Sequence, residues 1–364
     1  MNVNDVIQKL ESWADPSLQE SYDNSRLIVG DPKGEVSGVL VTLDATEDVV
    51  DEAISKGCNL IVAHHPIVFG GLKSFTGKNY VERTVIKAIK NDVAIYALHT
   101  NLDNVQSGVN QKIGEKLGIE NGRILAPKKG LLQKLVVFAE ESNAEAVREA
   151  IFKAGGGHIG NYDHCSFNLK GEGTFRGDQT TNPTIGEPGK LSRESEVRIE
   201  VILPAFASGR VVRAMKEAHS YEEVAYDLYS LENEWQNVGS GMIGELPAPM
   251  DVMDFLKKIK TSFEAGVVRH TKIPSKKIQK IAWCGGSGSF LLGHAIAAGA
   301  DVFITSDFKY HQFFDADNRI VIADIGHFEG EQFTKHLIVD YLKENFLNFA
   351  VLLSEVRTNP INYL

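Results

Sequence analysis

Cysteine is scarce in this chain, and the few cysteines stand far apart. Cys58, Cys165 and Cys284 are the only three among 364 residues, and no two of them form a CxxC pair. This spacing excludes a disulfide framework and a zinc site built from cysteines. We therefore expect a reduced environment, and a cytoplasmic protein.

Long apolar runs and an excess of positive charge are also missing. No hydrophobic stretch has the length needed to cross a membrane, and the first residues lack the basic and apolar regions of a signal peptide. The formal net charge is −10, whereas general nucleic-acid binding needs a basic face. We expect neither a membrane segment nor a general nucleic-acid partner.

The composition is that of a globular protein, with 43% hydrophobic and 24% charged residues. A chain of 364 residues exceeds one ordinary hydrophobic core, so two domains are expected. Residues 1–127 and 237–364 alternate short apolar runs with amphipathic segments, which is typical of an α/β main domain. Residues 128–236 follow the order β-α-β-β-α-β, which predicts an inserted ferredoxin-like α+β domain.

Two adjacent histidines end one of the apolar runs. Ile61, Val62 and Ala63 are expected in a buried strand, and His64 and His65 follow them directly. Sheets of α/β proteins bind ligands outside the carboxyl ends of their strands. Neutral imidazole is the commonest transition-metal ligand, so a metal site is predicted at this edge.

Two further apolar runs end in polar groups of the same kind. One is followed by His99 and Asp103, and another, near the C-terminus, by His327 and Glu331. His327 and Glu331 are four residues apart, so they share one face if a helix begins there. Three runs thus deliver histidine or carboxylate at the same end, and a metal site built from them would join both segments of the main domain.

These runs belong to longer motifs: Ala63-His-His-Pro66, Leu98-His-Thr-Asn-Leu-Asp103, Thr305-Ser-Asp-Phe-Lys-Tyr-His311 and Asp324-Ile-Gly-His327. Together they resemble the Nif-three-like family, whose members are often named GTP cyclohydrolase I type 2 homologues. The resemblance covers nearly the whole chain, and the stretch 128–236 is similar to the insert of the longer bacterial members. One minor departure is Ser220, where that insert usually carries proline.

The resemblance implies an α/β main fold, a dinuclear metal site and a toroidal homohexamer with a PII/CutA-like insert at its ends. The family's metal ligands fall on five residues of this chain: His64, His65, Asp103, His327 and Glu331.

Three imidazoles and two carboxylates are too many ligands for one tetrahedral zinc ion with an open position. They suit two ions, with Glu331 or Asp103 bridging them. Mixed nitrogen and oxygen ligands admit Zn²⁺, Fe, Mn²⁺, Co²⁺ or Ni²⁺, and we expect zinc or iron. The alternative is a polar network of structural histidines.

The roles of two histidines in these motifs allow several interpretations. His99 is interpreted as a general acid or base, as a group that holds Asp103 in place, or as a structural hydrogen-bonding residue. His311, with Lys309 and Tyr310, follows an expected strand and is a candidate proton donor or contact for an anionic substrate.

Three further sets of residues have interpretations of their own. The glycine-rich turn 285–288 predicts either phosphate binding through exposed backbone N–H groups or a tightly packed turn. Asp44 with Thr46 ends a strand and is interpreted as a helix cap. The histidines of the insert are interpreted as surface or packing residues: His158, His164 and His219.

Two functional hypotheses follow. The first is a metal-dependent hydrolase of a small molecule, such as a nucleotide or another phosphorylated or cyclic-amide compound. The second is a non-catalytic metal-binding scaffold or regulator whose insert senses a ligand or partner, as PII-like folds do. An open metal site with polar walls favours the enzyme, and a closed, saturated site favours the scaffold.

Overall fold

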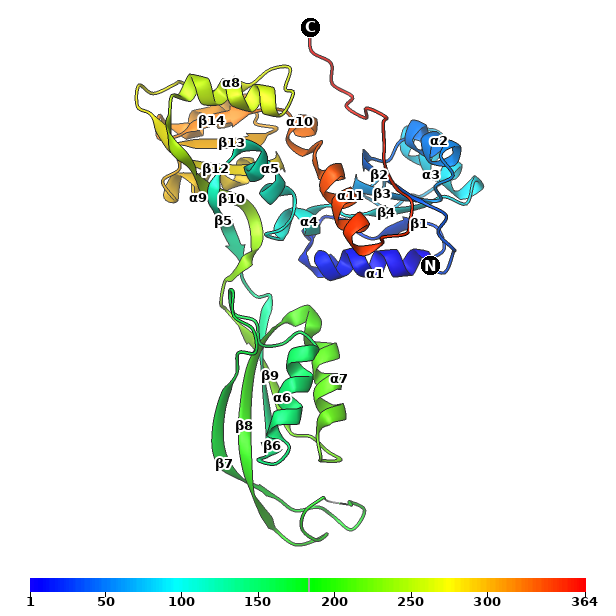
Figure 1. Cartoon of the computed structure of the whole chain (residues 1–364), viewed down its shortest axis with the longest axis vertical. Helices are drawn as coiled ribbons and strands as arrows, with labels where there is room; N and C mark the ends of the chain where they lie inside the picture. The colour runs from blue at the N-terminus through cyan, green and yellow to red at the C-terminus, as the bar shows by residue number, and fades with distance from the viewer. Residues whose placement is uncertain (183) are drawn as a thin grey trace. The chain divides into compact units, whose positions relative to one another are not determined.

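The structure is a computed structural model that describes residues 1–182 and 184–364. The chain divides into two compact units (Figure 1). Unit 1 consists of Met1–Ala126 and Asn237–Leu364, and unit 2 consists of Pro127–Gln236. Helices and strands alternate along most of the chain, so the α/β architecture predicted from the sequence is confirmed.

The first sheet of unit 1 has five strands in the order β1-β4-β3-β2-β15. β2, β3, β4 and β15 run parallel, and β1 is antiparallel to β4. Their bounds are β1 (Leu27–Val29), β2 (Val39–Asp44), β3 (Leu60–His65), β4 (Ala94–Ala97) and β15 (Val351–Leu353). Continuous apolar runs form the inner strands because such strands are buried on both faces.

Helices cover this first sheet on its buried faces (Figure 1). Val49, Val50 and Val85 of α2 (Glu47–Ser55) and α3 (Tyr80–Lys90) pack in one core with strand residues Leu40 and Ile61. The helix α11 (Thr334–Asn345) contacts β2 and β3. The ring of Tyr341 in α11 stacks on Trp13 of α1 (Val3–Trp13), with ring centroids 4.3 Å apart.

The second sheet of unit 1 has six strands in the order β11-β14-β13-β12-β10-β5. Its central strands β12, β13 and β14 are parallel, while β10 and β11 are antiparallel to their neighbours β12 and β14. The bounds are β5 (Glu120–Lys128), β10 (Trp235–Met250), β11 (Arg269–His270), β12 (Ile278–Ser287), β13 (Val302–Ser306) and β14 (Val321–Asp324).

The remaining helices of unit 1 are α4 (Thr100–Asn104), α5 (Val109–Leu117), α8 (Val252–Ser262), α9 (Leu292–Ala297) and α10 (His327–Glu331). Short 3₁₀ turns lie at Pro16–Leu18, Ser289–Leu291 and Tyr310–Ala316. Among the described residues, none of the helices combines the length and the apolar character that crossing a bilayer requires.

Unit 2 contains β6 (Leu132–Glu140), α6 (Ala144–Lys153), β7 (Phe167–Phe175), β8 (Ser192–Pro204), α7 (Ser208–Ala218) and β9 (Tyr226–Leu231). The four strands form an antiparallel sheet in the order β7-β8-β6-β9, the topology of a split β-α-β unit. Buried residues of both helices and of the strands β6 and β8 form its core, among them Leu135, Val147, Ile199 and Val211. A likeness to PII or CutA proteins stays a prediction.

Three features of the fold differ from the sequence expectation. The parallel strands that lead into the site belong to two sheets, and β10 and β5, for which no strands were predicted, extend the second of them. α5 and α11 were also not predicted. β8 begins at Ser192, which pairs with Phe175 of β7, although the residues just before Val197 have a polar, loop-like composition.

Candidate metal centre

His64 is the most deeply buried member of the predicted cluster. Its side chain is fully buried at the end of β3, and its Nδ1–H donates to the carbonyl oxygen of Leu98 over 2.8 Å. A carbonyl can only accept, so the proton is on Nδ1 and the lone pair is on Nε2. Nε2 has no hydrogen-bond partner, and it lies 3.7 Å from Asp103 Oδ1 and 3.9 Å from Glu331 Oε1.

His65 and His327 face the same carboxylate from two different sheets. Their Nε2 atoms lie 2.9 Å and 3.0 Å from Glu331 Oε2, and their ring centroids are 5.3 Å apart. On the other side of each ring, Nδ1 lies 2.7 Å from a carboxylate oxygen, of Asp44 for His65 and of Asp307 for His327. A carboxylate behind Nδ1 orients an imidazole so that Nε2 is presented to the site.

His99 completes this group of rings. It follows β4, and its ring centroid is 5.3 Å from those of His64 and His65. Nδ1 of His99 is 2.7 Å from Oδ1 of Asp23, whose other oxygen accepts hydrogen bonds from the backbone N–H and hydroxyl of Thr100. Burial acts to raise the pKa of Asp23, but the hydrogen bonds and charge of His99 outweigh it and lower that pKa.

Glu331 and Asp103 supply the two central carboxylates. Glu331 is 3% exposed, and the Oδ1 atom of Asp103 is buried without a hydrogen-bond partner. Burial and the charge of Glu331 raise the pKa of Asp103. Burial alone would also raise the pKa of Glu331, but the neighbouring His327 and His65 lower it. Two carboxylates that repel each other across a buried space can be stabilised by a cation between them.

The imidazole pKa values show how negative this site is. The charge of Glu331 raises the pKa of His327 to about 11, against the opposing effect of burial and with further help from Asp307. Burial would lower the pKa of His65, but hydrogen bonds to Asp44 and Glu331 raise it to about 9. Without a metal ion, both imidazoles therefore favour their protonated, positively charged form. A bound metal ion would supply that positive charge instead.

Three sets of potential ligand atoms lie within 4.8 Å of one another. The sets are His64 with His65 and His99, His65 with His327 and Glu331, and His64 with Asp103 and Glu331. All five predicted ligands and His99 are therefore brought together, and Glu331 belongs to two of the sets. α10 begins at His327 and places Glu331 one turn later on the same face, as the spacing predicted.

The cluster lies in the wall of a cavity of about 740 Å³. His65, His99, Asp103, His327 and Glu331 line this cavity together with aromatic and small polar residues. Burial raises the pKa of Cys284, which also lines the cavity, so that its thiol stays protonated. The polar cluster is thus reachable from a space large enough for a small ligand.

The glycine turn at the end of β12 brings the backbone close to Glu331. Gly286 has φ of +60°, and a Cβ atom there would lie 2.2 Å from Glu331 Oε1. The N–H of Gly285 donates to Asn110 Oδ1 over 2.9 Å, and the hydroxyls of Thr305 and Ser306 donate to the carbonyl of Gly286. The turn therefore packs tightly, which was one of its two interpretations.

Sequence comparison places this chain in a family. Residues 1–360 match the sequence profile described as Duf34/NIF3 (NGG1p interacting factor 3). The chain belongs to the Duf34/NIF3 family.

Curated Duf34/NIF3 relatives cover almost the full length of the chain. A protein of Halalkalibacterium halodurans named GTP cyclohydrolase 1 type 2 homolog is 41% identical over 99% of this chain and 98% of its own length. A Bacillus subtilis protein of the same name is 36% identical over 100% and 99%. A Bacillus cereus structure, described as a protein related to NIF3, has a TM-score of 0.87 at 38% identity, covering 100% of this chain and 99% of that one. The resemblance inferred from the motifs is confirmed.

One predicted site residue of this Duf34/NIF3 chain is not brought to the cluster. His311 is exposed, is not among the described residues that line the cavity, and packs its ring against Tyr310 and Phe314 at centroid distances of 5.1 Å and 6.3 Å. The reason is local: Asp307 takes a left-handed φ of 61°, and the chain then turns into the 3₁₀ segment Tyr310–Ala316. Asp307, which the prediction did not single out, is the residue after β13 that contacts a site histidine.

The carboxylates behind the histidines were missed by the sequence reasoning. Asp44 was interpreted as part of a helix cap, yet Thr46 alone caps α2 and Asp44 accepts from His65. Asp44 and Asp307 carry a usable signal, since each stands at the end of a strand or just beyond it. Asp23 and Thr358 lie in irregular segments, where no helix or strand pattern points to them, and the Thr358 hydroxyl donates to Asp44.

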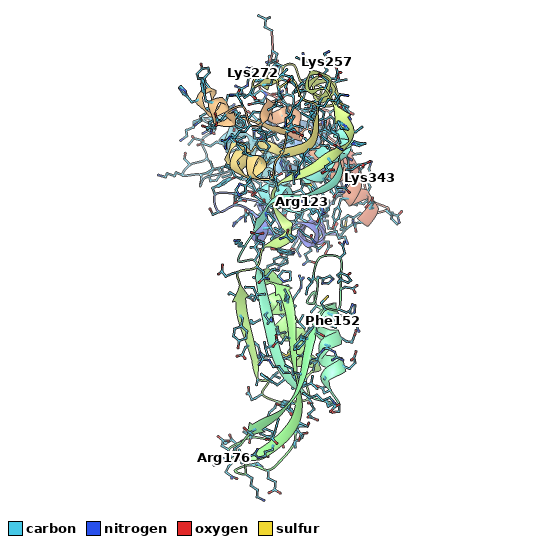
Figure 2. The ribbon with its side chains drawn as sticks, turned by 90° about the vertical axis from the view of Figure 1, so that its left-hand side faces the viewer. Arg123, Phe152, Arg176, Lys257, Lys272 and Lys343 are labelled. Carbon is cyan, nitrogen blue, oxygen red and sulfur yellow. The ribbon has the colours of Figure 1, made fainter. Side chains whose placement is uncertain are left out.

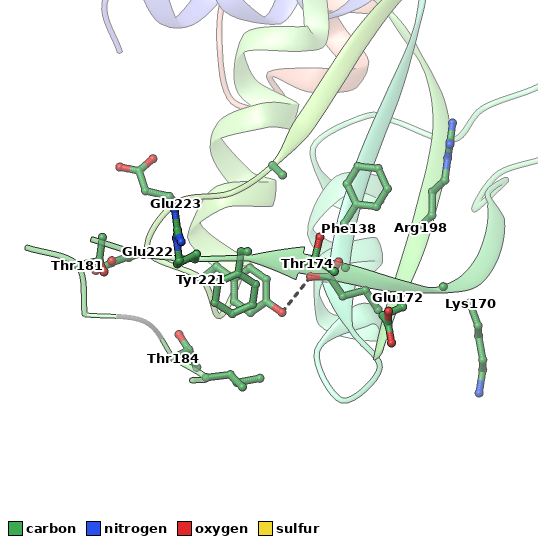
Figure 3. Close-up of a pocket in the computed structure, with 18 of the residues that line it drawn as sticks. Phe138, Lys170, Glu172, Thr174, Thr181, Thr184, Arg198, Tyr221, Glu222 and Glu223 are labelled. Carbon is green, nitrogen blue, oxygen red and sulfur yellow. Dashed lines mark hydrogen bonds between the residues drawn. The ribbon is translucent and has the colours of Figure 1, made fainter. Parts of the chain in front are cut away.

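Unit 2 of this family member has a separate cavity of about 630 Å³ (Figure 3). Phe138, Arg198 and Tyr221 are among its lining residues, and the hydroxyl of Tyr221 donates to Glu196 over 3.0 Å. His219 is buried beside it, with Nε2 2.8 Å from the carbonyl oxygen of Phe138, so it is a packing residue. Among the described residues of unit 2, no group of three potential metal ligands was found.

Proposed function

We propose that this protein binds two divalent metal ions and hydrolyses a small molecule with their help. The proposed ligands are His64, His65, Asp103, His327 and Glu331. The observation that carries the proposal is the buried, unpartnered Nε2 lone pair of His64, which faces the oxygens of two carboxylates. A buried acceptor that faces other acceptors needs a donor or a cation between them, and a divalent metal ion would meet all three groups at once.

The number of ions is supported by the sharing of Glu331 between two ligand sets. One set places it with His65 and His327, and the other with His64 and Asp103. A carboxylate has two oxygens, so Glu331 can serve both sets at once and reduce the repulsion between two cations. The mixed imidazole and carboxylate donors suit zinc or iron, and also admit manganese, cobalt or nickel.

The residues around the cluster have defined tasks in this proposal. Two bound divalent ions would supply Lewis acidity and lower the pKa of a water molecule. Asp44 and Asp307 hold His65 and His327 in the tautomer that presents Nε2. His99, held through Nδ1 by Asp23, presents its Nε2 atom as the group that takes or returns a proton.

The test is metal analysis of protein purified from its native host, followed by a hydrolysis screen on that protein. We expect close to two ions per chain and turnover of at least one small compound that is lost after chelation. Chains that contain no metal, and take up none when it is supplied, would contradict the proposal. Two ions without any hydrolysis would favour the second hypothesis.

The second hypothesis is a metal-binding scaffold or regulator that senses a ligand through unit 2. The cavity in unit 2 is the observation that favours it. The cavity beside the metal cluster favours the enzyme, because a purely structural site would have no need of an open polar wall. A ligand that binds unit 2 and leaves hydrolysis unchanged would separate the two hypotheses.

Two other properties stay proposals. A homohexamer is supported by the family resemblance, and light scattering would test it: a 40 kDa monomer at micromolar concentration would exclude it. A cytoplasmic location is supported by the scarcity and wide spacing of cysteine, and fractionation of host cells would test it.

A further inference from the structure

We propose that the substrate of this site is a small, uncharged compound with a planar ring, and not a polyphosphate nucleotide. The inference rests on the proposed hydrolase function and names its substrate class. It differs from the reading that the relatives' name, GTP cyclohydrolase 1 type 2 homolog, would suggest. It is carried by the charges and by the aromatic side chains around the cavity.

The described lining residues of the cavity offer no lysine or arginine side chain to a polyphosphate. Its described lining residues include four carboxylates, Glu20, Asp44, Asp103 and Glu331, and neither lysine nor arginine. Proteins hold triphosphates with lysine, arginine and clusters of backbone N–H groups in addition to metal ions. A described lining that has carboxylates and neither lysine nor arginine favours a neutral substrate over a polyanion.

Five cations of unit 1 have other positions or partners. Lys257, Lys272 and Lys343 project from its surface (Figure 2). Arg269 pairs with Asp324, and the guanidinium of Arg357 stacks on the ring of Phe328 at 5.7 Å. None of these five is among the described residues that line the cavity.

The glycine turn is engaged within the protein at Gly285 and Gly286. A phosphate-binding turn presents free backbone N–H groups to its ligand. Here the N–H of Gly285 is used by Asn110, and the carbonyl of Gly286 is turned to Thr305 and Ser306. The turn serves to bring Gly286 against Glu331, which is a packing task.

Four aromatic side chains line the same cavity and are mostly exposed. Their exposed fractions are 68% for Tyr22, 54% for Phe69, 60% for Tyr80 and 64% for Phe290. Phe69 also packs edge-on against His99, with centroids 5.6 Å apart, so it lies directly beside the cluster. Exposed aromatic faces gathered around one polar site are typical of recognition of a planar ring by stacking.

A cyclic amide combines these properties with hydrolysis. Water supplies a hydroxyl to the carbonyl carbon and a proton to the ring nitrogen, so one C–O bond forms and one C–N bond breaks. Neither an oxidant nor a second substrate is needed. His99 lies on the same cavity wall as Asp103 and Glu331, where it can pass the proton to the nitrogen.

The test compares two ligands that share one ring. Binding of guanosine and of GTP to the zinc-loaded full-length protein would be measured by equilibrium dialysis, with uracil as a neutral, planar cyclic amide. We expect at least one of the two neutral compounds to bind roughly tenfold or more tightly than GTP. Phe69→Ala and Phe290→Ala should each weaken that binding by roughly tenfold, since each removes a stacking face.

Matched controls are present in the chain. Phe75 and Phe314 are 58% and 67% exposed but are not among the described lining residues, so Phe75→Ala and Phe314→Ala should leave binding unchanged. All four variants should keep the metal content of the parent protein. Tighter binding of GTP than of both neutral compounds would overturn the inference. So would an absence of neutral binding at millimolar concentration, or equal binding by the two cavity variants and the controls.

The substrate class and the hydrolase proposal fail in different ways. If a neutral ring binds in a Phe69-dependent manner but no compound is ever hydrolysed, the substrate class stands and the hydrolase proposal is wrong. If GTP binds more tightly and is hydrolysed in a metal-dependent reaction, the hydrolase stands and the substrate class is wrong.

Discussion

Each of the two sheets of unit 1 positions one histidine through an Asp–His pair at the ends of neighbouring strands. In the first sheet, Asp44 at the end of β2 lies opposite His65 at the end of the neighbouring strand β3. In the second, Asp307 just after β13 meets His327 just after the neighbouring strand β14. Both contacts measure 2.7 Å. The carboxylate and the imidazole meet in each case because the ends of adjacent parallel strands lie side by side.

The two Asp–His pairs differ in their exposure to water. The His65 and Asp44 side chains are 16% and 33% exposed, whereas those of His327 and Asp307 are 37% and 48% exposed. Solvent weakens a hydrogen-bonded ion pair, so the first sheet should hold its histidine more firmly than the second. Glu331 is the one ligand that both histidines face, and the two halves should therefore depend on it equally.

The largest expected effect is that of Glu331→Gln. This change keeps the volume but removes the charge that both histidines share, so metal affinity should fall by more than about 100-fold at both positions and hydrolysis should be lost. Metal content by elemental analysis and activity would be measured together.

Glu329→Gln is the matched control for this variant. Glu329 lies on the same short helix and is equally buried, but its Oε1 accepts from Asn359 and it is not part of any ligand set. Metal content should stay at the parental value. If Glu329→Gln loses metal while Glu331→Gln retains it, the ligand assignment on α10 is wrong.

The next effect is that of pH on metal affinity. The raised pKa values of His65, about 9, and His327, about 11, mean that both rings carry protons at pH 7 in the metal-free protein, and a cation must displace them. Affinity should therefore increase with pH from 6 to 9, by roughly tenfold per pH unit for each displaced proton. Calorimetry of zinc binding in buffers of different ionisation enthalpy would show the released protons; zinc binding without proton release would contradict the prediction.

The two Asp–His pairs can be disrupted separately by substitution of each aspartate. Asp44→Asn should lower the metal affinity by roughly 10- to 100-fold, because the amide no longer holds His65 in the required tautomer. Asp307→Asn should have a smaller effect, of about tenfold or less, because its pair is more exposed. Zinc titrations of the two variants would test this order, and an equal or reversed order would show that solvent exposure does not set the difference.

Thr358→Val is expected to have a smaller effect still. The Thr358 hydroxyl donates to the Asp44 oxygen that does not face His65, so its loss acts on the histidine through one further residue. A decrease of about two- to fivefold in metal affinity is expected, following the modest value of one hydrogen bond to a charged group. Thr358→Ser retains the hydroxyl and should restore the parental affinity; if it does not, the methyl contact is what matters.

Removal of residues 128–236 should affect the site least. We propose that this stretch is an inserted domain, because unit 2 has its own core and contains none of the proposed ligands. Joining 127 to 237 through a short Gly/Ser linker should leave a folded protein that binds the same number of ions. Loss of both folding and metal would show that the stretch belongs to the main domain.

Much of this architecture was predictable because the sequence repeats one local pattern. Buried strands appear as apolar runs, and parallel strands deliver the residues that follow them to one edge, so His64, His65, His99 and Asp103 could be grouped before their positions were known. The spacing of His327 and Glu331 likewise determined that they share one face of α10. The metal role of these residues stays a prediction.

Only the tertiary structure decided which groups surround them. The direction of a chain after a strand depends on single backbone angles, and the left-handed Asp307 turns His311 away while bringing its own carboxylate to His327. Contacts such as Thr358 with Asp44 join segments 314 residues apart and leave no periodic trace in the sequence. Hydrophobic periodicity therefore determined the strands and the candidate ligands, whereas turn geometry and long-range packing decided how the ligands are held and which charges line the cavity.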